Sequence, residues 1–416
     1  MPLGSKWNRR NFLGMIGGAA GAIAAPGKLF AAKAGTKVSG FGHTGNPYEE
    51  LGVATVINCQ GTMTVLGGSV IRPELEAVMA QAGKHFVRIL ELEVAAGKRI
   101  AEMLKLPEGY TALVTSGAAA AMESGLAGIL TGDNPQFIRQ IPDLTGMRSE
   151  VIIQKSHRNA FDHQLRNTGV NLVIIETREE LRKAVNEKTA MMHFSNFANA
   201  AGQIKVDEWV KLAKEYKIPC MNDAAADTPP VSHLWDYATM GYDLITFSGG
   251  KAIRGPQCAG MLIGRKELVA NAFLNNSPHE DTIGRSQKVG KEEIVGMVKA
   301  LELFLKEDHD ALWKHWQGEL EYVSARLTRI PGVNTSFFVP DIANHVPHMA
   351  IDWDLAKITI THEEVSKVLK DSKPSIVLGG GEDRPGLVMC SFMLQPGESK
   401  IVADNLVTVL GQHSNR

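Results

Sequence analysis

The amino-acid sequence predicts an α/β protein: a large, mostly parallel seven-stranded sheet domain followed by a smaller α+β domain. Short, almost wholly apolar runs alternate with helix-like stretches between about residues 110 and 265, which is typical of a parallel sheet buried on both faces. This alternation stops near residue 290, where two long helical stretches follow one another. Hydrophobic residues make up 44% of the 416-residue chain, which is enough for a large core.

The N-terminal segment, residues 1–34, has the layout of an export signal. Arg9 and Arg10 precede an apolar run at 15–25 that is rich in glycine and alanine. This layout resembles a twin-arginine signal and predicts export to the periplasm. The run is shorter than the ~20 residues that span a bilayer, so no stable membrane span is expected in the mature protein. An uncleaved anchor or a chance arginine pair are the alternatives, and cleavage could follow Ala24, Ala32 or Ala34.

The large domain is placed at residues 50–289, with an approach segment at its N-terminal end. Its seven expected strands are residues 111–115, 151–154, 172–175, 190–194, 219–223, 244–248 and 261–263. Three of the helices expected between them are residues 118–130, 179–185 and 207–215. Because the seven runs follow one another in one continuous stretch, they predict one large sheet rather than two small ones.

The smaller domain is placed at residues 290–416. Apolar residues at i, i+3 and i+4 spacing predict a helix over 292–306, and a second helix is expected at about 311–328. Thr361 and Glu364 form a capping-box pattern, which predicts that a third helix begins there. The strand-like runs of this domain are residues 348–352 and 387–391.

Charge and cysteine content exclude several classes of function. Lys plus Arg total 44 and Asp plus Glu total 45, so no basic surplus indicates a nucleic-acid partner. The four cysteines form no Cys-x-x-Cys pair and no His-Glu-x-x-His motif occurs, so neither a disulfide framework nor a metal site is expected. Glycine, at 41 of 416 residues, exceeds the ~7% average and indicates tight turns or close approach of the backbone to a ligand.

Lys251 is the first candidate for chemistry. An apolar strand is expected to end at Ser248, and two glycines and Lys251 follow at its carboxyl end, where ligands of open α/β sheets bind. A lysine that is desolvated in such a place has a lowered pKa and can act as a nucleophile. The alternative is an ordinary surface lysine in a glycine turn.

Asp223 ends the preceding expected strand, and three alanines follow it. An aspartate and a lysine on neighbouring strand ends suggest a pyridoxal 5'-phosphate site. In such a site the lysine forms a Schiff base with the cofactor, and the carboxylate keeps the pyridine nitrogen protonated so that the ring acts as an electron sink. Small residues such as Ala225 would leave the face of the ring uncrowded. The alternative for Asp223 is a helix N-cap.

Two further stretches would complete this site. Ser116, Gly117 and Ala118 form a turn from strand to helix, where free backbone N–H groups and the helix dipole make an anion site for the phosphate. His157 follows another expected strand, and we predict that its flat ring stacks on the pyridine ring and takes part in catalysis with Lys251. For His163, a solvated or packed helix histidine is the favoured interpretation.

Together these residues resemble the fold-type-I pyridoxal phosphate enzymes, whose large domain is aspartate aminotransferase-like. The nearest branch contains selenocysteine synthase and D-glucosaminate-6-phosphate ammonia lyase. The resemblance runs from about residue 50 to the end of the chain, and the phrases 247–251 and 288–292 are fairly specific to this branch. The other matching phrases are residues 61–64, 66–69, 115–120, 222–225, 254–257, 293–296 and 393–398.

The resemblance makes Lys251 the Schiff-base lysine and Asp223 the partner of the pyridinium nitrogen. It also implies a homodimer or an assembly of dimers, with active sites at the subunit interfaces. Taken with the residues above, the predicted cofactor-binding set is Ser116, Gly117, Ala118, His157, Asp223, Ala225, Ser248 and Lys251. The residues predicted to reach the substrate or a neighbouring subunit are Arg254, Arg285, Lys288 and Arg384.

The sequence departs from the resemblance at the expected carboxylate-binding position. Enzymes of this fold often hold the substrate α-carboxylate with an arginine of the small domain, but glycines occupy the comparable stretch here, 379–381. Arg384 could replace the missing arginine, or the carboxylate could be held in another way. The export signal and the lack of a basic surplus both argue against a reaction on transfer RNA.

The predicted function is that of a pyridoxal phosphate enzyme acting on an amino acid or an amino-sugar acid through Lys251. The branch resemblance favours a lyase of the ammonia-lyase type that works by α,β-elimination. Lys251, released as a free amine, would remove the α-proton of the substrate as general base. The alternatives are an aminotransferase, a racemase or an aldolase on the same fold, and an exported binding protein that has lost activity.

Overall fold

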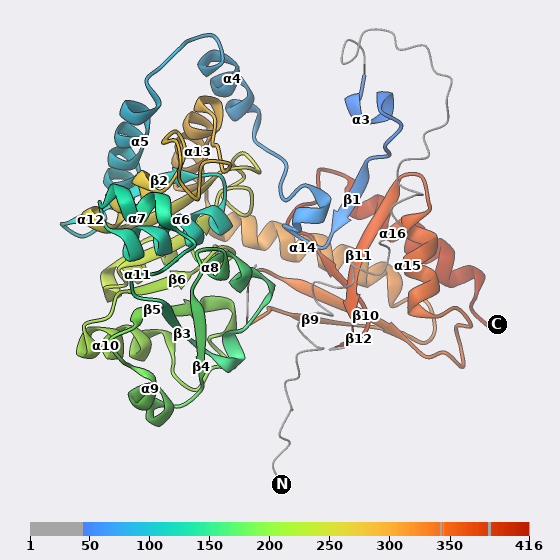
Figure 1. Ribbon diagram of the computed structural model, residues 1–416. Coiled ribbons are helices and arrows are strands. Elements are labelled where there is room, and N and C mark those ends of the chain that lie inside the picture. Colours follow the sequence, from blue (N-terminus) through green and yellow to red (C-terminus); the bar gives the residue numbers. More distant parts are fainter. Residues whose placement is uncertain (1–44, 342, 344, 382–383, 416) are drawn as a thin grey trace. The chain divides into compact units, whose positions relative to one another are not determined.

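The computed structural model describes residues 45–341, 343, 345–381 and 384–415 (Figure 1). The predicted signal, 1–34, lies outside the described residues. The chain divides into two compact units, which are described separately below. A sheet unit holds residues 67–307 with the described residues of the short segment 340–345, and a small unit holds residues 45–66 together with 308–339 and the described residues of 346–415. Among the described helices, none combines the length and the apolar character needed to cross a membrane.

The sheet unit is built on seven strands in the order β2-β8-β7-β6-β5-β3-β4. They are β2 (Tyr110–Thr115), β3 (Glu150–Gln154), β4 (Asn171–Ile175), β5 (Thr189–Ser195), β6 (Cys220–Asp223), β7 (Leu244–Ser248) and β8 (Gly260–Arg265). Only β8 runs antiparallel to its neighbours, so the sheet is mostly parallel, as predicted. Each predicted strand overlaps one of these seven. The prediction succeeds because the inner strands are buried on both faces and therefore read as apolar runs.

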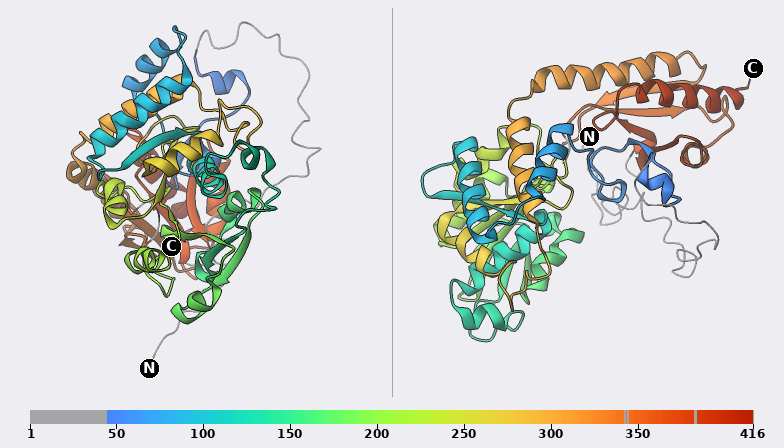
Figure 2. Two further views of the ribbon diagram at one scale, coloured as in Figure 1. Left: turned by 60° about the vertical axis from the view of Figure 1, so that its left-hand side comes forward. Right: turned by 90° about the horizontal axis from the view of Figure 1, so that it is seen from above.

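Helices cover both faces of this sheet (Figures 1 and 2). On one face α6 packs so closely that a Cβ atom at Gly125 would lie 2.7 Å from Met221 Cε. On the other face the rings of Phe194 in β5 and Trp209 in α10 lie 5.9 Å apart. The helices of this unit are α4 (Pro73–Ala82), α5 (Ile89–Leu104), α6 (Ala118–Thr131), α7 (Pro135–Gln140), α8 (His163–Asn167), α9 (Arg178–Ala184), α10 (Val206–Tyr216), α11 (His233–Met240), α12 (Lys266–Leu274) and α13 (Lys291–Phe304).

Helix α5 covers the free edge of the sheet along β2. A Cβ atom at Gly97 would lie 2.0 Å from the Ala112 carbonyl oxygen, so only glycine allows the helix to come this close. One turn away, Glu93 Oε2 accepts a hydrogen bond from the Val114 N–H (3.2 Å). Glu93 is only 2% exposed, and burial raises the pKa of its carboxyl group to about 8. A side chain thus takes the place of a neighbouring strand at this edge.

The small unit contains a five-stranded sheet in the order β1-β11-β12-β10-β9, in which only β1 and β11 are parallel. Its strands are β1 (Val56–Cys59), β9 (Val333–Phe338), β10 (His348–Trp353), β11 (Ser375–Gly381) and β12 (Arg384–Cys390). Its helices are α3 (Pro47–Glu50), α14 (His309–Leu327), α15 (His362–Lys370) and α16 (Glu398–Gln412). The helix α15 begins with the predicted capping box of Thr361 and Glu364. Helices α14 and α16 lie side by side (Figure 2) and contribute to the core of this unit.

The division into units differs from the predicted domains at both boundaries. The predicted helix over 292–306 exists as α13, but it packs on α4 and α5 and therefore belongs to the sheet unit. Its buried face is formed by the apolar positions that predicted it, such as Ile294, Met297 and Leu301. At the N-terminal side, β1 pairs with β11 and so belongs to the small unit rather than to the large domain. The main segment of the sheet unit therefore begins at residue 67 and ends at residue 307, and the short segment 340–345 also belongs to this unit.

Candidate active site

The carboxyl ends of β6 and β7 bring the predicted aspartate and lysine to one edge of the sheet. Asp223 is the last residue of β6 and lies opposite Thr246 of the neighbouring β7. Lys251 follows three residues after β7 ends at Ser248. Because both strands run in the same direction, their carboxyl ends meet at the same edge, where open α/β sheets bind ligands. The parallel pairing of β6 with β7 produces this juxtaposition.

Asp223 is buried and its side chain is oriented by two donors. Its Oδ1 atom accepts hydrogen bonds from the Ala225 N–H (3.2 Å) and from Thr246 Oγ1 (3.2 Å). The strand end is fixed further, because the Ala224 N–H donates to the Thr246 carbonyl (3.1 Å). A carboxylate held in this way can keep a basic ring nitrogen protonated.

Lys251 is half-buried by accessible surface and lies in a compact loop between β7 and β8. Burial lowers the pKa of its ammonium group, while the negative charges of Asp223 and Asp227 oppose this change. A lowered pKa increases the fraction of neutral amine, which is the nucleophilic form. The loop is closed by hydrogen bonds from the Gly249 N–H to the Ala259 carbonyl and from the Gly255 N–H to the Gly249 carbonyl, each 2.8 Å long.

A glycine-rich segment, residues 67–70, lies against the lysine loop. Gly68 has a φ of +74°, and a Cβ atom there would lie 2.6 Å from the Gly250 carbonyl oxygen. Arg254 Nε donates to the Val70 carbonyl (2.9 Å) and so ties this segment to the loop. Arg254 was predicted to reach the substrate or a second subunit. The structure shows its Nε engaged within the subunit.

The N-terminus of α6 has the features of a phosphate site. Its N-cap, Gly117, offers no side chain to the first N–H groups of the helix, and its φ is +117°. A Cβ atom at Gly260 of β8 would lie 2.7 Å from the Gly117 carbonyl carbon, so glycine is needed at both positions. Thr115, Gly260 and Ser248 lie opposite one another on β2, β8 and β7. Ser248 therefore lies in the same row of the sheet as Thr115, which precedes the α6 N-cap by two residues. The cradle of Ser116, Gly117 and Ala118 with Ser248 stays a prediction.

His157 is fully buried and lies in the 3-10 turn η3 (Lys155–His157), which follows β3. Its Nδ1 atom accepts the Ser195 N–H (3.2 Å), and its ring meets the edge of Phe194 at 4.4 Å between centroids. Burial lowers the pKa of this imidazole to about 3, so the ring is neutral. Ser195 lies opposite Asp223 in the sheet, which places His157 near the candidate site. Its stacking on a cofactor ring stays a prediction.

The remaining predicted residues do not lie in the segments that directly follow β6 and β7. His163 is exposed on α8 and contacts Arg166, in agreement with the solvated interpretation. Arg285 is half-buried and Lys288 is exposed in the connection between α12 and α13. Arg384 begins β12 of the small unit, where it is paired with Gly381 of β11. The three glycines at 379–381 form the end of β11.

Three residues at the site escaped the sequence analysis: Asp227, Asn196 and Tyr237. Asp227 is 7% exposed and accepts a hydrogen bond from Tyr237 Oη (3.3 Å), which in turn accepts one from Asn196 Nδ2 (2.7 Å). Burial, together with the charge of Asp223, raises the pKa of Asp227 to about 7. The one available signal was a carboxylate four residues after Asp223, separated from it only by alanines.

Several known proteins are similar to this chain. Residues 78–382 match the family model of class-V aminotransferases. D-Glucosaminate-6-phosphate ammonia lyase of Salmonella typhimurium (strain 14028s / SGSC 2262) is 27% identical over 344 residues, which cover 80% of this chain and 89% of that protein. A 5'-C-glycyluridine monooxygenase-decarboxylase of a Streptomyces species is 26% identical over 344 residues, covering 80% and 83% of the two chains.

The structure also resembles solved structures. That of a D-glucosaminate-6-phosphate ammonia-lyase superposes with a TM-score of 0.77 at 24% identity and covers 89% of this chain and 99% of that chain. At this level of identity the likeness concerns the fold. It confirms the predicted arrangement of a large parallel sheet with a smaller α+β part.

Proposed function

The chain belongs to the class-V aminotransferase family, whose fold-type-I members depend on pyridoxal phosphate, and on this basis we propose that it is a lyase acting on an amino acid or amino-sugar acid. The observation that carries the proposal is the meeting of Asp223, Lys251 and the uncapped α6 N-terminus at one edge of the sheet. An acid, an amine and an anion site in this arrangement match the three polar parts of the cofactor.

The residues present fit pyridoxal phosphate. The Lys251 amine would bond the cofactor aldehyde, and Asp223 would face the ring nitrogen. The first N–H groups of α6 and the Ser248 hydroxyl would hold the phosphate, for which the missing side chain at Gly117 leaves open space. When bound, the cofactor supplies an electron sink for a carbanion formed at the substrate α-carbon. The lowered pKa of Lys251 suits its amine to remove the α-proton as general base.

A lyase reaction is supported by the similarity to D-glucosaminate-6-phosphate ammonia lyase over most of both chains. In an α,β-elimination Lys251 would take the α-proton and a group would leave the β-carbon, so that ammonia is finally released without an amino acceptor. An aminotransferase would need a keto-acid acceptor instead. A screen of amino acids and amino-sugar acids that measures ammonia and keto-acid release separates these reactions. Strict dependence on an acceptor would contradict the lyase proposal.

Cofactor binding has a direct spectroscopic test. The purified protein with added pyridoxal phosphate is expected to be yellow, with an absorption band near ~420 nm. Lys251→Ala is expected to abolish this band, and Lys266→Ala, a lysine at the start of α12, serves as the matched control. A wild-type protein that takes up no cofactor would contradict the proposal as a whole.

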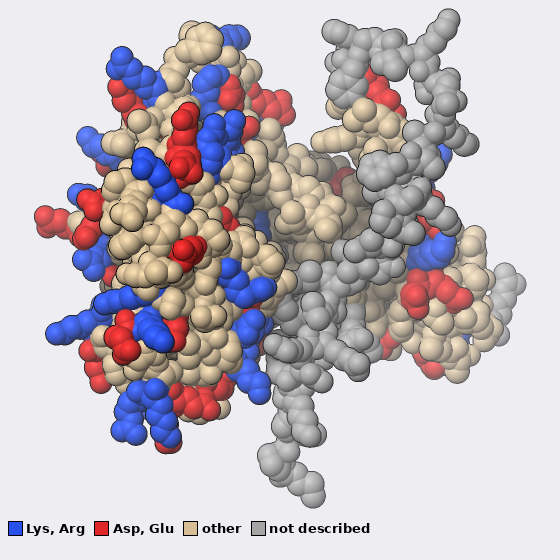
Figure 3. Space-filling model, viewed as in Figure 1, with Lys and Arg blue, Asp and Glu red and all other residues tan. Residues whose placement is uncertain are grey.

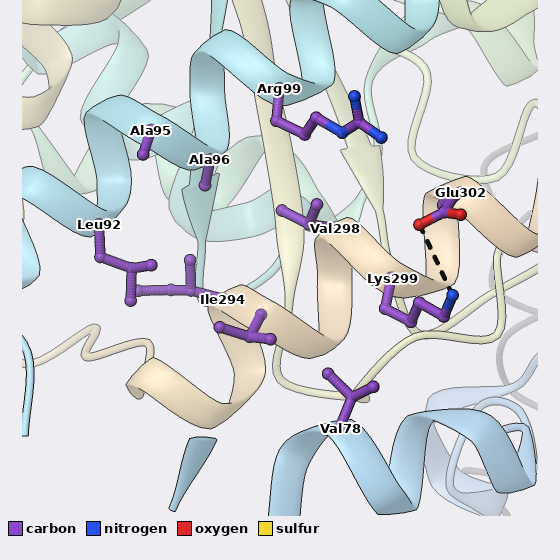
Figure 4. Close-up of a pocket in the computed structure, with 10 residues that line it drawn as sticks. Val78, Leu92, Ala95, Ala96, Arg99, Ile294, Val298, Lys299 and Glu302 are labelled. Atoms are coloured by element: carbon purple, nitrogen blue, oxygen red, sulfur yellow. Dashed lines mark ion pairs between the residues drawn. The ribbon is translucent and has the colours of Figure 1, made fainter. Parts of the chain in front are cut away.

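A homodimer is supported by exposed apolar side chains around the start of α5. Phe86 and Val87 in the connection from α4 are followed by Leu90 and Val94, whose exposed fractions are 48% and 69%. Beside them lies a cavity of about 320 Å³ between α4, α5 and α13 (Figure 4). Its wall is largely apolar, and its rim carries the ion pair of Lys299 and Glu302 (3.6 Å). Burying such side chains against a second copy would remove them from water.

The dimer proposal is tested by sedimentation velocity. Phe86→Asp places a charge in the proposed interface and is expected to shift the protein towards monomer. Ile174→Asp on the edge strand β4 changes an equally apolar exposed residue elsewhere and is the control. A wild-type monomer, or a dimer that Phe86→Asp leaves intact, would contradict this interface.

We also propose export through a twin-arginine signal, supported by Arg9, Arg10 and the short apolar run after them. Changing both arginines to lysine keeps the charge and removes the motif. We expect this double variant to stay in the cytoplasmic fraction, whereas unaltered export would contradict the proposal.

On the face shown in Figure 3, basic and acidic side chains are interspersed over the described part of the sheet unit, in keeping with the balanced charge of the sequence.

A further inference from the structure

Arg72 links the loop that carries Lys251 to a distant part of the sheet unit. It follows the glycine-rich segment, precedes α4 and is only 6% exposed. Its Nη1 atom donates to the Ile253 carbonyl in the lysine loop, and its Nε and Nη2 atoms donate to Glu307 Oε1 (3.2 and 2.7 Å). Ile253 is fully buried, so this contact lies inside the unit. All three guanidinium nitrogens of Arg72 are therefore engaged within the sheet unit.

The peptide unit between Ile253 and Arg254 connects Arg72 to Lys251. Its carbonyl oxygen accepts from Arg72, and its N–H donates to the Lys251 carbonyl (2.9 Å). Because a peptide unit is planar, an arginine that fixes the oxygen also fixes the direction of the N–H. A cationic donor polarises the peptide unit as well, and this strengthens the hydrogen bond that its N–H makes. The main chain of Lys251 is thus held by Arg72 through a single peptide unit.

Arg254 carries backbone strain in the same turn. Its φ is +56°, which lies in the left-handed region that favours glycine. Its side chain holds it there, because Nε donates to the Val70 carbonyl (2.9 Å) in the glycine-rich segment. Strained residues persist where the surrounding structure over-determines them, and they concentrate at functional sites. The strain lies three residues after Lys251 and indicates that the shape of this turn serves the lysine.

Glu307 makes the link specific for arginine. Its Oε1 atom accepts from two guanidinium nitrogens of Arg72, while the third reaches the Ile253 carbonyl. A planar guanidinium group presents its donors in fixed directions, whereas a lysine ammonium is a compact charge on a flexible chain. The ion pair is also largely buried, with side chains that are 8% and 25% exposed, so solvent screens it less than a surface pair. A lysine at position 72 could keep the ion pair but would not fix the carbonyl as well.

We propose that Arg72 and Arg254 are positioning residues, which fix the turn after Lys251 and so hold its amine in the direction needed to bond the cofactor. Together, the contacts of Arg72 with Ile253 and of Arg254 with Val70 form an arginine clamp. The inference rests on the proposed function, in which Lys251 bonds the cofactor aldehyde. It assigns Arg254 to the support of the lysine loop instead of to the substrate. Without the clamp the amine is still present but samples more orientations, so it bonds more slowly.

Amide hydrogen exchange of the apoprotein, resolved to single residues by mass spectrometry, tests the clamp without the cofactor. In Arg72→Ala we expect the Arg254 N–H to exchange at least ~10-fold faster than in wild type, because the charge-assisted hydrogen bond that orients its peptide unit is lost. Arg72→Lys is expected to exchange nearly as fast, because it loses the guanidinium fork. The amides of β7 should keep their wild-type rates, which separates a local effect from a general loss of stability. The matched control is Arg265→Ala, which removes an exposed ion pair with Asp243 just before β7 and should leave the Arg254 amide unchanged.

Stopped-flow absorbance then tests the effect on Lys251. When apoprotein is mixed with saturating pyridoxal phosphate, the ~420 nm band should grow at least ~10-fold more slowly in Arg72→Ala than in wild type. Arg254→Ala should slow it as well, and this variant covers the case in which Arg72→Ala does not fold, because it leaves the ion pair with Glu307 in place. Arg265→Ala should show the wild-type rate.

The outcomes separate the clamp, its role and the proposed function. An Arg254 amide that exchanges at the wild-type rate in Arg72→Ala overturns the clamp. Faster exchange combined with a wild-type rate of band formation in both arginine variants overturns the positioning role. Absence of the ~420 nm band in wild type would refute the proposed function, whereas the exchange measurement would still decide whether the clamp exists.

Discussion

Replacing the buried Glu93 by glutamine should stabilise the protein, and the gain should grow with pH. Glu93 lies under the edge of the large sheet, where burial raises the pKa of its carboxyl group from 4.5 to about 8. The folded state therefore keeps this group protonated at neutral pH, whereas the unfolded chain ionises it. Folding at pH 7 must take up a proton, and this costs free energy. Glu93→Gln removes the titration while keeping an oxygen that can accept the Val114 N–H.

The sign and size follow from the two pKa values. Because the folded pKa is raised for an acid, the penalty is absent below about pH 4.5, grows with pH, and is complete above about pH 8. At 1.36 kcal/mol per unit, the penalty is about 3 kcal/mol at pH 7 and approaches about 5 kcal/mol above pH 8. The difference in free energy of unfolding between variant and wild type should therefore rise by roughly 1.4 kcal/mol per pH unit between about pH 5 and 8.

Urea unfolding followed by circular dichroism at pH 5, 6, 7 and 8 measures this difference. Glu91→Gln is the matched control, since Glu91 lies on the same helix with a side chain that is 68% exposed, and it should leave the profile within about 0.5 kcal/mol of wild type. Parallel pH profiles for Glu93→Gln and wild type would refute the reasoning, because they would mean that Glu93 titrates in the folded protein as it does in water.

Three further changes test the geometry of the site and of the sheet edge. Gly260→Ala places a Cβ atom 2.7 Å from the Gly117 carbonyl carbon, and pushing the α6 N-terminus away should weaken pyridoxal phosphate binding at least tenfold in an absorbance titration. Ser248→Ala should weaken it by about tenfold, or about 1.4 kcal/mol, through one lost hydrogen bond to the phosphate, and unchanged affinity would remove Ser248 from the cradle. Gly97→Ala should lower the free energy of unfolding by about 2–3 kcal/mol, because its Cβ atom would lie 2.0 Å from the Ala112 carbonyl oxygen; a melting temperature equal to wild type would contradict this packing.

The large sheet was predictable because its strands are short apolar runs with a helix after most of them. The strands of the small unit were harder to find. β9 has a single buried residue, Val333, β1 is four residues long, and β11 ends in three glycines. Such segments become strands only through their neighbours. The placement of α13 in the sheet unit likewise depends on its packing against α4 and α5. The sequence of α13 does not indicate which helices it packs against.

The candidate site shows the same limit. Asp223 and Lys251 were found because each ends a recognisable strand, and the order of strands brings them together. The Asn196–Tyr237–Asp227 chain comes from the end of β5, the middle of α11 and the β6–α11 turn. Each of these residues is ordinary in its local sequence. Their relationship arises from tertiary structure, so only the fold could reveal it.

The pairing of β1 with β11 has a consequence for the order of events during synthesis. Val56 pairs with Ser375, and Gln60 Nε2 donates to the Leu378 carbonyl (2.7 Å) across 318 positions of the chain. A chain emerging from the ribosome has made the main segment of the sheet unit, 67–307, long before β11 exists. The large unit can therefore fold first, while β1 stays unpaired until β11 has been synthesised. Closing so long a loop adds little entropy cost once an intervening unit is compact, but it delays completion of the small unit until the last strands are made.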